Sequence, residues 1–585
     1  MSANSTNGAQ SLATMLSDDQ LPSSDFRPPT SDFRLPAANI AALLTAHAAR
    51  CADQPAILDP LGRDIAPIKY RTITFGELDL LTDRLAAELI GRGVTPGMKL
   101  VLFVPFSTEF IAWTFALLKA GVVAVLIDPG MGRSNIFRCL EEVEPDGFVA
   151  IRRVQWIRAL LRKRFPRARH NITVRPLAPE RPRPVSRPQS AALPAIAARD
   201  PAAIIFTSGS TGPPKGVLYE HGMFVAQARL IQDFYGIEPG EVDLPGFPLF
   251  GLFNAAMGVT TVIPQMDPTR PARVDPTNIS SAMAQQEVTQ AFGSPAFWNR
   301  VGRHYHERRP TPPGLKRALS AGGPVPLHVV ERVSQLVLES QAEFHTPYGA
   351  TECLPVASIG AREILNRTAA LTRTGAGTCV GRPFPEVEVA IIAATEAPIP
   401  AIAAARQLPA GEIGEIIVRS PSATREYYRR AEGTSLAKIP DPSGPAAGRP
   451  DFWHRMGDVG YLDADGLLWF CGRKAHVVHT ERGPLYSVCC EGIFDAHPGV
   501  YRSALIGLGE RPRQTPVLVV EPEPDTARDS DAQSSLINEL LMLAASLELT
   551  HTIRTILLHP ALPVDTRHNV KINREALATW AIGRI

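Results

Sequence analysis

The sequence contains no uninterrupted apolar run long enough to cross a membrane, which takes about 20 apolar residues. Its most apolar segment, residues 110–127, is interrupted by Lys119 and Gly121, a pattern that predicts a buried helix followed by a strand. Residues 1–33 are rich in Ser, Asp, Asn and Pro and lack the basic and apolar regions of a secretory signal. We therefore expect a disordered leader and no stable insertion into a membrane.

Cysteine is scarce and net charge is almost absent. The seven cysteines have no metal-site spacing, since adjacent Cys489 and Cys490 cannot together make an ordinary zinc knuckle. An odd number of cysteines in so long a chain favours a reducing, cytoplasmic compartment. The net charge is +2, and there is neither a long basic tail nor a basic patch interleaved with aromatic residues, so no nucleic-acid partner is expected.

The densest run of basic residues lies at 152–169, on a segment with helical spacing that also carries Trp156, Leu160 and Leu161. A charge run of this kind usually forms a solvated helix face. We favour that interpretation over a membrane-surface or protein-docking patch.

The chain has 585 residues, of which 45% are hydrophobic, so it can bury large cores and should fold as more than one domain. Helical spacing at residues 38–50, 75–92 and 136–143 alternates with short apolar strands at 99–104 and 122–127. Such alternation predicts an α/β fold with helices on both faces of parallel sheets. Irregular connections are expected at residues 175–194, 394–409 and 438–450.

One ten-residue stretch carries the strongest chemical signal. Residues 207–216 read Thr-Ser-Gly-Ser-Thr-Gly-Pro-Pro-Lys-Gly and follow an apolar strand expected at 202–206. Glycines let backbone N–H groups approach phosphate oxygens, hydroxyls add donors, and a lysine supplies a point charge. The loop is not a Walker A loop, because Lys215 follows two prolines and precedes Gly216. The expected phosphate-binding residues are Ser208, Gly209, Ser210, Thr211, Gly212 and Lys215.

These ten residues resemble the signature loop of the adenylate-forming enzymes, the superfamily of acyl-CoA synthetases, peptide-synthetase adenylation domains and luciferases. Thr-Pro-Tyr-Gly-Ala-Thr-Glu at residues 346–352 is similar to the second core motif of that superfamily. The resemblance implies that Tyr348 stacks on adenine, that Thr351 contacts phosphate and that Glu352 helps to hold Mg²⁺. It also implies a nucleotide-binding role for Gly322 and Gly349, and a share in holding the metal for Thr207.

Two further pairs match the superfamily in the same order along the chain. Gly-Asp at residues 457–458 resembles the position at which an aspartate accepts both ribose hydroxyls, a role that Asp458 would take. Gly-Arg at residues 472–473 resembles the junction between the two family domains, where Arg473 would also reach the nucleotide. The resemblance therefore implies ATP and Mg²⁺ as cofactors.

The implied fold has a large N-terminal domain of stacked parallel sheets with helices, residues 34–472, and a small mobile C-terminal α/β domain, residues 473–585. The small domain would present Lys571 to the α-phosphate that the substrate attacks, so Thr207, Glu352 and Lys571 are the expected catalytic residues. Val570 stands where the superfamily usually has glycine, and a positive φ there would be strained. The hinge residue stays open, because Lys474 and Ala475 follow Arg473.

The reaction after adenylation is indicated by a departure and a closer resemblance. Ordinary acyl-CoA synthetases usually carry a histidine after Pro-Leu-Phe, where this chain has Gly251. The resemblance to the olefin β-lactone synthetases of bacterial hydrocarbon biosynthesis implies that a long-chain 2-alkyl-3-hydroxy acid closes to a β-lactone. It also implies other enzymes of an olefin pathway as partners. The stretches that carry it lie at residues 266–271, 293–296, 374–381 and 567–572.

Two alternatives stay open. A long-chain fatty acid:CoA ligase is compatible with Gly483 and Glu491, which keep part of the usual C-terminal pattern, and a degenerate adenylate-binding scaffold is supported by Val570 alone. The apolar residues 247–253, with Met257, either line a pocket for alkyl chains or belong to the core. The sequence does not identify the base for lactone formation, for which the candidates are His221, His345 and His479.

Overall fold

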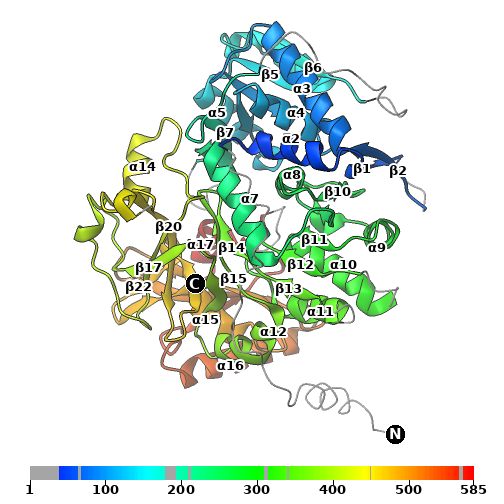
Figure 1. Ribbon diagram of the computed structural model, residues 1–585. Coiled ribbons are helices and arrows are strands. Elements are labelled where there is room, and N and C mark those ends of the chain that lie inside the picture. The colour runs from blue at the N-terminus through cyan, green and yellow to red at the C-terminus, as the bar shows by residue number, and fades with distance from the viewer. Residues whose placement is uncertain are drawn as a thin grey trace.

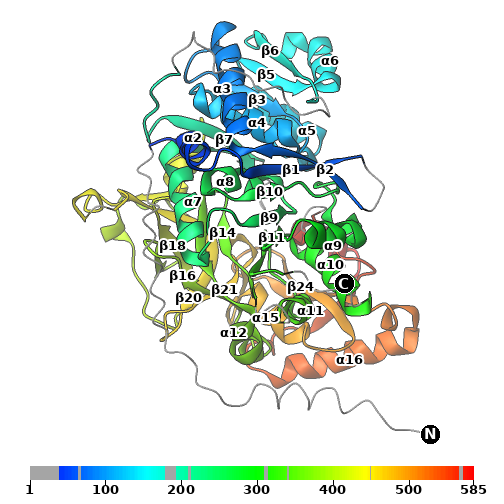
Figure 2. The ribbon, with the colours of Figure 1, turned by 45° about the vertical axis from the view of Figure 1, so that its right-hand side comes forward.

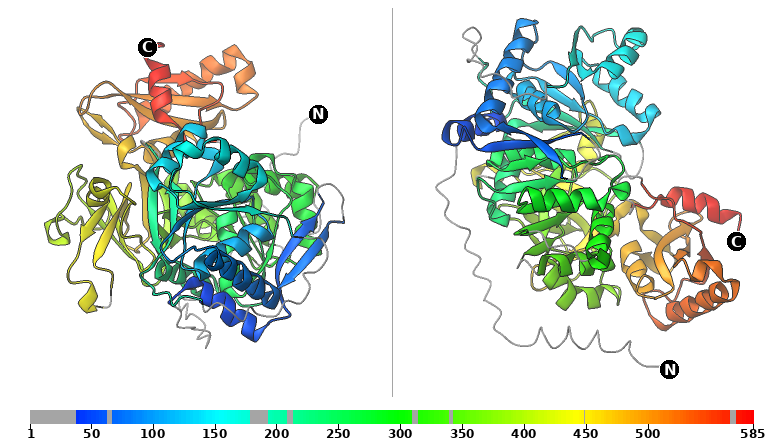
Figure 3. Two further views of the ribbon diagram at one scale, coloured as in Figure 1. Left: turned by 90° about the horizontal axis from the view of Figure 1, so that it is seen from above. Right: turned by 90° about the vertical axis from the view of Figure 1, so that its right-hand side faces the viewer.

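The computed structural model describes residues 38–62, 67–177, 193–207, 213–308, 314–338, 342–447, 449–565 and 571–585. The expected leader at residues 1–33 and the loop residues 208–212 lie outside these ranges. Figure 1 shows the part of the chain coloured blue to cyan at one end of the molecule. The C-terminal segment forms a lobe beside the larger part (Figure 3).

A six-stranded sheet forms the first layer. Neighbouring strands pair in parallel except β7 and β8, which form an antiparallel hairpin. Most strands are short runs of buried apolar residues, as expected for a sheet that is covered on both faces. The spatial order is β6 (His170–Val174), β5 (Gly147–Ile151), β3 (Lys99–Phe103), β4 (Val123–Leu126), β7 (Pro201–Thr207) and β8 (Lys215–Glu220).

The helices of this region begin where the sequence supplies caps. Thr74 and Glu77 form a reciprocal capping box at the start of α3, and Ser107 caps α4. Lys119, which interrupts the apolar run, is buried in α4, and its ammonium lies 2.6 Å from carboxylate oxygens of Asp79 and of Asp83. Among the described helices none is long and apolar enough to cross a membrane. The helices are α2 (Ile40–Arg50), α3 (Phe75–Gly91), α4 (Thr108–Lys119), α5 (Arg133–Val143) and α6 (Arg152–Leu160).

A seven-stranded sheet lies next, and its neighbouring strands pair in parallel except for β1 and β2, which pair antiparallel at one edge. Its order is β13 (Glu343–His345), β12 (Arg317–Ser320), β11 (Gln290–Gly293), β9 (Val242–Pro245), β10 (Thr260–Val262), β1 (Pro55–Leu61) and β2 (Lys69–Thr74). The helices of this part of the chain are α7 (His221–Tyr235), α8 (Pro248–Met257), α9 (Pro276–Gln285), α10 (Pro295–Arg308) and α11 (Leu327–Leu338).

The third sheet has eight strands, and its described pairs are antiparallel. Strand β19 (Lys438–Pro440) pairs with β20 beside the main path. The main path is β14 (Tyr348–Ala350), β15 (Cys353–Ser358), β16 (Thr378–Pro383), β21 (Leu468–Arg473), β20 (Phe452–Leu462), β18 (Gly414–Arg419) and β17 (Glu388–Ile392). Helices α12 (Ala361–Glu363), α13 (Ala369–Thr372) and α14 (Ala431–Ala437) lie in the connections.

The described residues after Arg473 build two small sheets and three helices, which lie at the lower end of the molecule in Figure 2. Strands β24 and β25 pair antiparallel and β26 joins in parallel. The strands are β22 (Val478–Thr480), β23 (Gly483–Leu485), β24 (Val500–Leu508), β25 (Thr515–Pro522) and β26 (Thr555–Leu558), and the helices are α15 (Ser487–Phe494), α16 (Ser530–Ser546) and α17 (Arg574–Ile582). The boundary at residues 472–473 and the mobility of this part stay predictions.

The structure departs from the sequence-based expectation in two places. The connection expected at residues 438–450 contains β19 and a short 3-10 turn at 445–447. A three-residue strand carries too little periodicity to be recognised, and β19 exists because it pairs with β20. The antiparallel sheet was not expected either, because the helix and strand alternation that predicts parallel sheets stops near residue 345.

Candidate active site

A cavity of about 2230 Å³ lies between the sheets. It is lined by residues that are far apart in the sequence, and we call it the central cavity. The structure brings nine of the expected site residues to its wall: Lys215, Gly322, Tyr348, Gly349, Thr351, Glu352, Asp458, Arg473 and Lys571.

The phosphate-binding stretch connects the two strands of a hairpin. Thr207 ends β7 and pairs with Lys215, the first residue of β8. The described flanks thus hold the ends of the ten-residue stretch together, while Ser208, Gly209, Ser210, Thr211 and Gly212 lie outside the described residues, as does the side chain of Thr207. The ammonium of Lys215 lies 5.0 Å from the centre of the Tyr427 ring, within reach of a cation–π attraction.

The second motif forms the tight connection between β14 and β15. Gly349 has no room for a side chain, since a Cβ atom there would lie 2.9 Å from Cβ of Leu354. The carbonyl oxygen of Glu352 accepts hydrogen bonds from the backbone N–H of Thr424 at 2.9 Å and from its hydroxyl at 3.0 Å. The hydroxyl of Tyr219 donates to the carbonyl of Thr351. The backbone that carries Thr351 and Glu352 is therefore held from two other segments.

The carboxylate of Glu352 has a partner that the sequence analysis missed. The hydroxyl of Tyr427 donates to Oε1 of Glu352 at 2.9 Å, while Oε2 makes no hydrogen bond with the described residues. Burial and the nearby carboxylate raise the pKa of Tyr427, so its hydroxyl stays a neutral donor. Tyr427 therefore contacts both Lys215 and Glu352 and fixes one oxygen of the carboxylate.

Asp458 lies in the wall of the central cavity beside two polar partners. Its Oδ2 accepts a hydrogen bond from the Tyr348 hydroxyl at 2.5 Å. Its Oδ1 lies 2.9 Å from Nη1 of Arg473 but accepts no hydrogen bond from the described residues. Burial raises the pKa of the Asp458 carboxyl, and the positive charge of Arg473 opposes that rise. The pairing of β20 with β21 places Asp458 opposite Arg473, so the ion pair follows from strand register.

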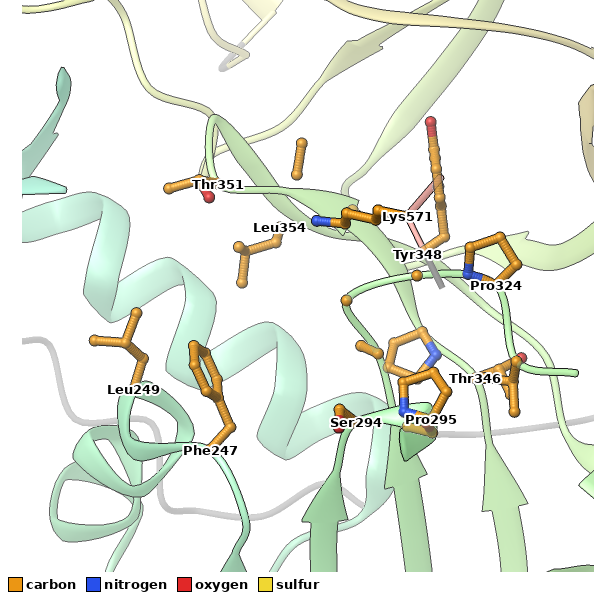
Figure 4. Close-up of a pocket in the computed structure, with 18 of the residues that line it drawn as sticks. Phe247, Leu249, Ser294, Pro295, Pro324, Thr346, Tyr348, Thr351, Leu354 and Lys571 are labelled. Carbon is orange, nitrogen blue, oxygen red and sulfur yellow. The ribbon is translucent and has the colours of Figure 1, made fainter. Parts of the chain in front are cut away.

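Lys571 reaches the same cavity from the C-terminal part of the chain. Val564 and Ile572 form a bridge, and the backbone N–H of Lys571 donates to Oδ1 of Asp565 at 2.9 Å. Figure 4 shows the Lys571 side chain extending into the cavity between Leu354 and Tyr348, on the side where Thr351 lies. Residue 570, the valine in place of glycine, lies outside the described residues.

An apolar region continues from these polar groups. The segment that was expected either to line a pocket or to join the core does both, because Met257 is buried in the core while Phe247, Leu249, Phe250, Leu252 and Phe253 line the cavity. Figure 4 shows Phe247 and Leu249 across the pocket from Lys571. Gly251, within the same segment, is buried. A Cβ atom there would lie 2.9 Å from Cζ of Phe106 and 3.0 Å from Cγ of Pro245. A histidine cannot fit at this position without displacing those rings.

None of the three histidines named as candidates for the base, His221, His345 and His479, lines the central cavity. Burial lowers the pKa of two of them, His221 and His345, to about 4. The histidines that do line the cavity are His328, His454, His476 and His497.

The comparisons with known proteins agree with this site. The sequence profile of the family described as AMP-binding enzyme matches residues 44–428, well over half of the chain. The chain belongs to this family. It is an adenylate-forming enzyme, an AMP-forming ligase, and the family uses ATP.

Two relatives are similar to this chain over nearly its whole length. An olefin beta-lactone synthetase of Xanthomonas campestris pv. campestris is 45% identical over 551 residues, which cover 93% of this chain and 97% of that protein. An olefin beta-lactone synthetase of Stenotrophomonas maltophilia is 45% identical over 556 residues, covering 93% and 98%. Among solved structures, an amide bond synthetase from Marinactinospora thermotolerans has a TM-score of 0.72 at 22% identity, covering 92% and 99%, which shows the adenylate-forming fold.

The residues present fit a magnesium nucleotide. The buried Oδ1 of Asp458, which accepts no hydrogen bond from the described residues, could accept one from a ribose hydroxyl. Oε2 of Glu352 is a hard oxygen of the kind that Mg²⁺ prefers, and the Glu352 backbone and Oε1 are held by Thr424 and Tyr427. Mg²⁺ usually takes one or two carboxylates together with substrate phosphates and water, so the carboxylate of Glu352, which shares its partner Tyr427 with Lys215, suits it.

Proposed function

We propose that this enzyme activates a long-chain 2-alkyl-3-hydroxy fatty acid as its acyl-adenylate and then closes the acid to a β-lactone. The observation that carries the proposal is the continuity of the central cavity, which joins Asp458, Glu352 and Lys571 to the phenylalanines of residues 247–253. One acid with a long apolar chain would contact both regions at once. The resemblance to two proteins named olefin beta-lactone synthetases supports the same substrate class.

In the first step the substrate carboxylate attacks the α-phosphate of ATP, and pyrophosphate leaves. Asp458 would hold the ribose, Tyr348 would face the adenine, and Lys215 with the stretch at residues 207–212 would bind the phosphates. Mg²⁺, held by Glu352 and Thr207, would neutralise phosphate charge. Lys571 would stabilise the negative charge that develops on the α-phosphate in the transition state, because its ammonium enters the cavity from the C-terminal part.

In the second step the 3-hydroxyl attacks the activated carbonyl, and its proton passes to water or to the departing AMP phosphate. AMP leaves with the electron pair of the acyl–oxygen bond. Because nucleophile and carbonyl belong to one molecule, the effective concentration of the hydroxyl is high, although ring strain offsets part of that gain. No thiol has to enter. The packing of Gly251 against Phe106 and Pro245 fits this scheme, because it leaves no room for the histidine that ordinary acyl-CoA synthetases usually carry at this position.

Product analysis by NMR tests the proposal. Purified protein is incubated with MgATP and a racemic 2-alkyl-3-hydroxy fatty acid, with and without coenzyme A. We expect β-lactone and AMP in the absence of coenzyme A. A thioester that forms only with coenzyme A would instead make the protein an acyl-CoA ligase, and the absence of AMP under both conditions would reject this acid as the substrate.

Two further points belong to the same proposal. A β-lactone product implies other enzymes that make the hydroxy acid and that decarboxylate the lactone. The C-terminal part, residues 473–585, would act as the small domain that presents Lys571, with the junction directly after Arg473, where β21 ends.

A further inference from the structure

Helix α6 exposes its large apolar side chains instead of burying them. Trp156, Ile157 and Leu160 are 69%, 55% and 84% exposed. The helix is fixed to the sheet by Gln155, its one buried residue, whose side-chain amide donates to the carbonyls of Phe148 at 3.0 Å and Ile172 at 2.8 Å. An amphipathic helix that packs on its own protein turns its apolar face inward, so the outward apolar face of α6 needs another explanation.

The same surface is strongly basic. No Asp or Glu occurs between Asp146 and Glu180. Arg164 and Arg167 pair with acidic groups at the edge of this region, Glu141 and Asp146. A further set of exposed basic residues forms no ion pair with the described residues: Arg152, Arg153, Arg162, Lys163 and Arg169. The basic side chains are exposed, as expected for a solvated helix face, and they share one short segment with exposed apolar side chains.

The surface adjoins an opening of the central cavity. Ile151, Val154 and Ile157 line the cavity, and Ile157 is also more than half exposed. The cavity wall therefore reaches the surface at α6, which lies at the outer end of the six-stranded sheet beside β5 and β6 (Figure 2).

We propose that α6 and the turn at residues 162–164 dock on an anionic lipid bilayer. Trp156 and Leu160 would enter the boundary between headgroups and acyl chains, while the unpaired arginines and Lys163 would contact lipid phosphates. Nothing in this surface crosses the bilayer, because α6 spans only nine residues. The docked orientation places the opening at Ile157 against the lipid layer, where a long-chain acid partitions. The docking itself does not depend on which product the enzyme makes.

Vesicle binding of the full chain tests the proposal. Co-sedimentation is measured with phosphatidylcholine vesicles and with vesicles containing about 30% phosphatidylglycerol, a composition that supplies the negative surface potential. We expect binding to the anionic vesicles that weakens with salt, and little binding to phosphatidylcholine alone. Equal binding to both, or no binding to either, would overturn the proposal.

Matched variants locate the surface. Trp156→Ser/Leu160→Ser and Arg153→Glu/Lys163→Glu should each weaken binding at least about tenfold, because each removes two groups that contribute to interfacial binding. Met542→Ser is the control, since Met542 is 66% exposed on α16, in the C-terminal part. Unchanged binding of both double variants, or an equal loss in the control, would overturn the assignment.

Two other measurements separate competing occupants. Wild-type dimers that become monomers in Trp156→Ser/Leu160→Ser, without vesicle binding, would assign the surface to a second copy of the chain. Binding of duplex DNA that is lost in Arg153→Glu/Lys163→Glu, again without vesicle binding, would assign it to nucleic acid. Each variant should unfold thermally within a few degrees of wild type, which checks that it is folded. AMP release with a short soluble acid should be unchanged, because the substituted residues do not line the central cavity.

Discussion

Replacing Tyr427 by Phe isolates one hydrogen bond at the candidate metal ligand. The phenyl ring keeps its place 5.0 Å from the Lys215 ammonium, so only the donor to Oε1 of Glu352, at 2.9 Å, is lost. A hydrogen bond to a charged group contributes about 1.5–3 kcal/mol. Glu352 is half-buried, so water can replace part of the bond. We therefore expect the lower end of this range, which is about a tenfold fall of kcat/KM at about 1.4 kcal/mol per factor of ten.

The assay is pyrophosphate release at varied Mg²⁺ concentration. If Tyr427 orients the carboxylate toward the metal, Tyr427→Phe should need more Mg²⁺ for half-maximal rate, and saturating Mg²⁺ should restore part of the rate. Tyr461→Phe is the matched control, since the Tyr461 hydroxyl donates to the carbonyl of Ala376 at 3.1 Å outside the cavity wall. Wild-type kinetics and wild-type Mg²⁺ dependence in Tyr427→Phe would refute the reasoning, and an equal loss in both variants would indicate a general effect of destabilisation.

Three other predictions concern catalysis, packing and acid stability. Lys571→Ala should lower AMP formation by about two orders of magnitude or more with nearly intact ATP binding measured by calorimetry; unchanged turnover would remove Lys571 from the mechanism. Gly251→Ala should lower the free energy of unfolding, measured by denaturant titration, by about 1–3 kcal/mol, because its Cβ would lie 2.9 Å from Phe106. Gly91→Ala is the control: no atom lies within 4 Å of its Cβ, so it should not lower the free energy of unfolding. His221 is fully buried, and its pKa is lowered to about 4. The unfolded chain therefore binds the proton more readily, and up to about 3 kcal/mol of the free energy of unfolding should be lost as the pH falls from 6.5 to 4. His221→Leu should flatten that part of the profile of stability against pH, and an unchanged slope would show that His221 is not its cause.

Local patterns predicted the first half of the fold well. The helices expected at residues 38–50 and 75–92 are α2 and α3, and the strands expected at 99–104 and 122–127 are β3 and β4, with ends shifted by one or two residues. These elements were readable because their apolar residues repeat at the helical or strand period and their N-termini carry capping residues. The antiparallel sheet could not be predicted in this way, because its strand order is set by pairing between strands that are distant in the sequence, such as β16 and β21.

The candidate site could be anticipated only where a motif carried it. The motifs supplied Asp458 and Glu352, and no motif indicated Tyr427 or Thr424, which lie in the connection between β18 and α14. Their roles arise from tertiary contacts with the carbonyl and carboxylate of Glu352. A polar and aromatic stretch directly after the wholly buried strand β18 was the one available signal, since functional side chains concentrate in loops at strand ends.

The segment directly after Arg473, where we predict the junction, is held against β18. The ammonium of Lys474 donates to the carbonyl of Thr395 at 2.8 Å and lies 3.2 Å from Oε1 of Glu415, a buried carboxylate on β18 that also pairs with Arg455. A rotation at this junction that pulled Lys474 away would leave the buried carboxylate of Glu415 with less compensating positive charge. Breaking a buried ion pair outright costs about 3–5 kcal/mol. The contacts of the junction therefore stabilise the arrangement that holds Lys571 in the cavity. A reaction whose two steps both occur on one bound acid, without an incoming thiol, can run to completion in that single arrangement.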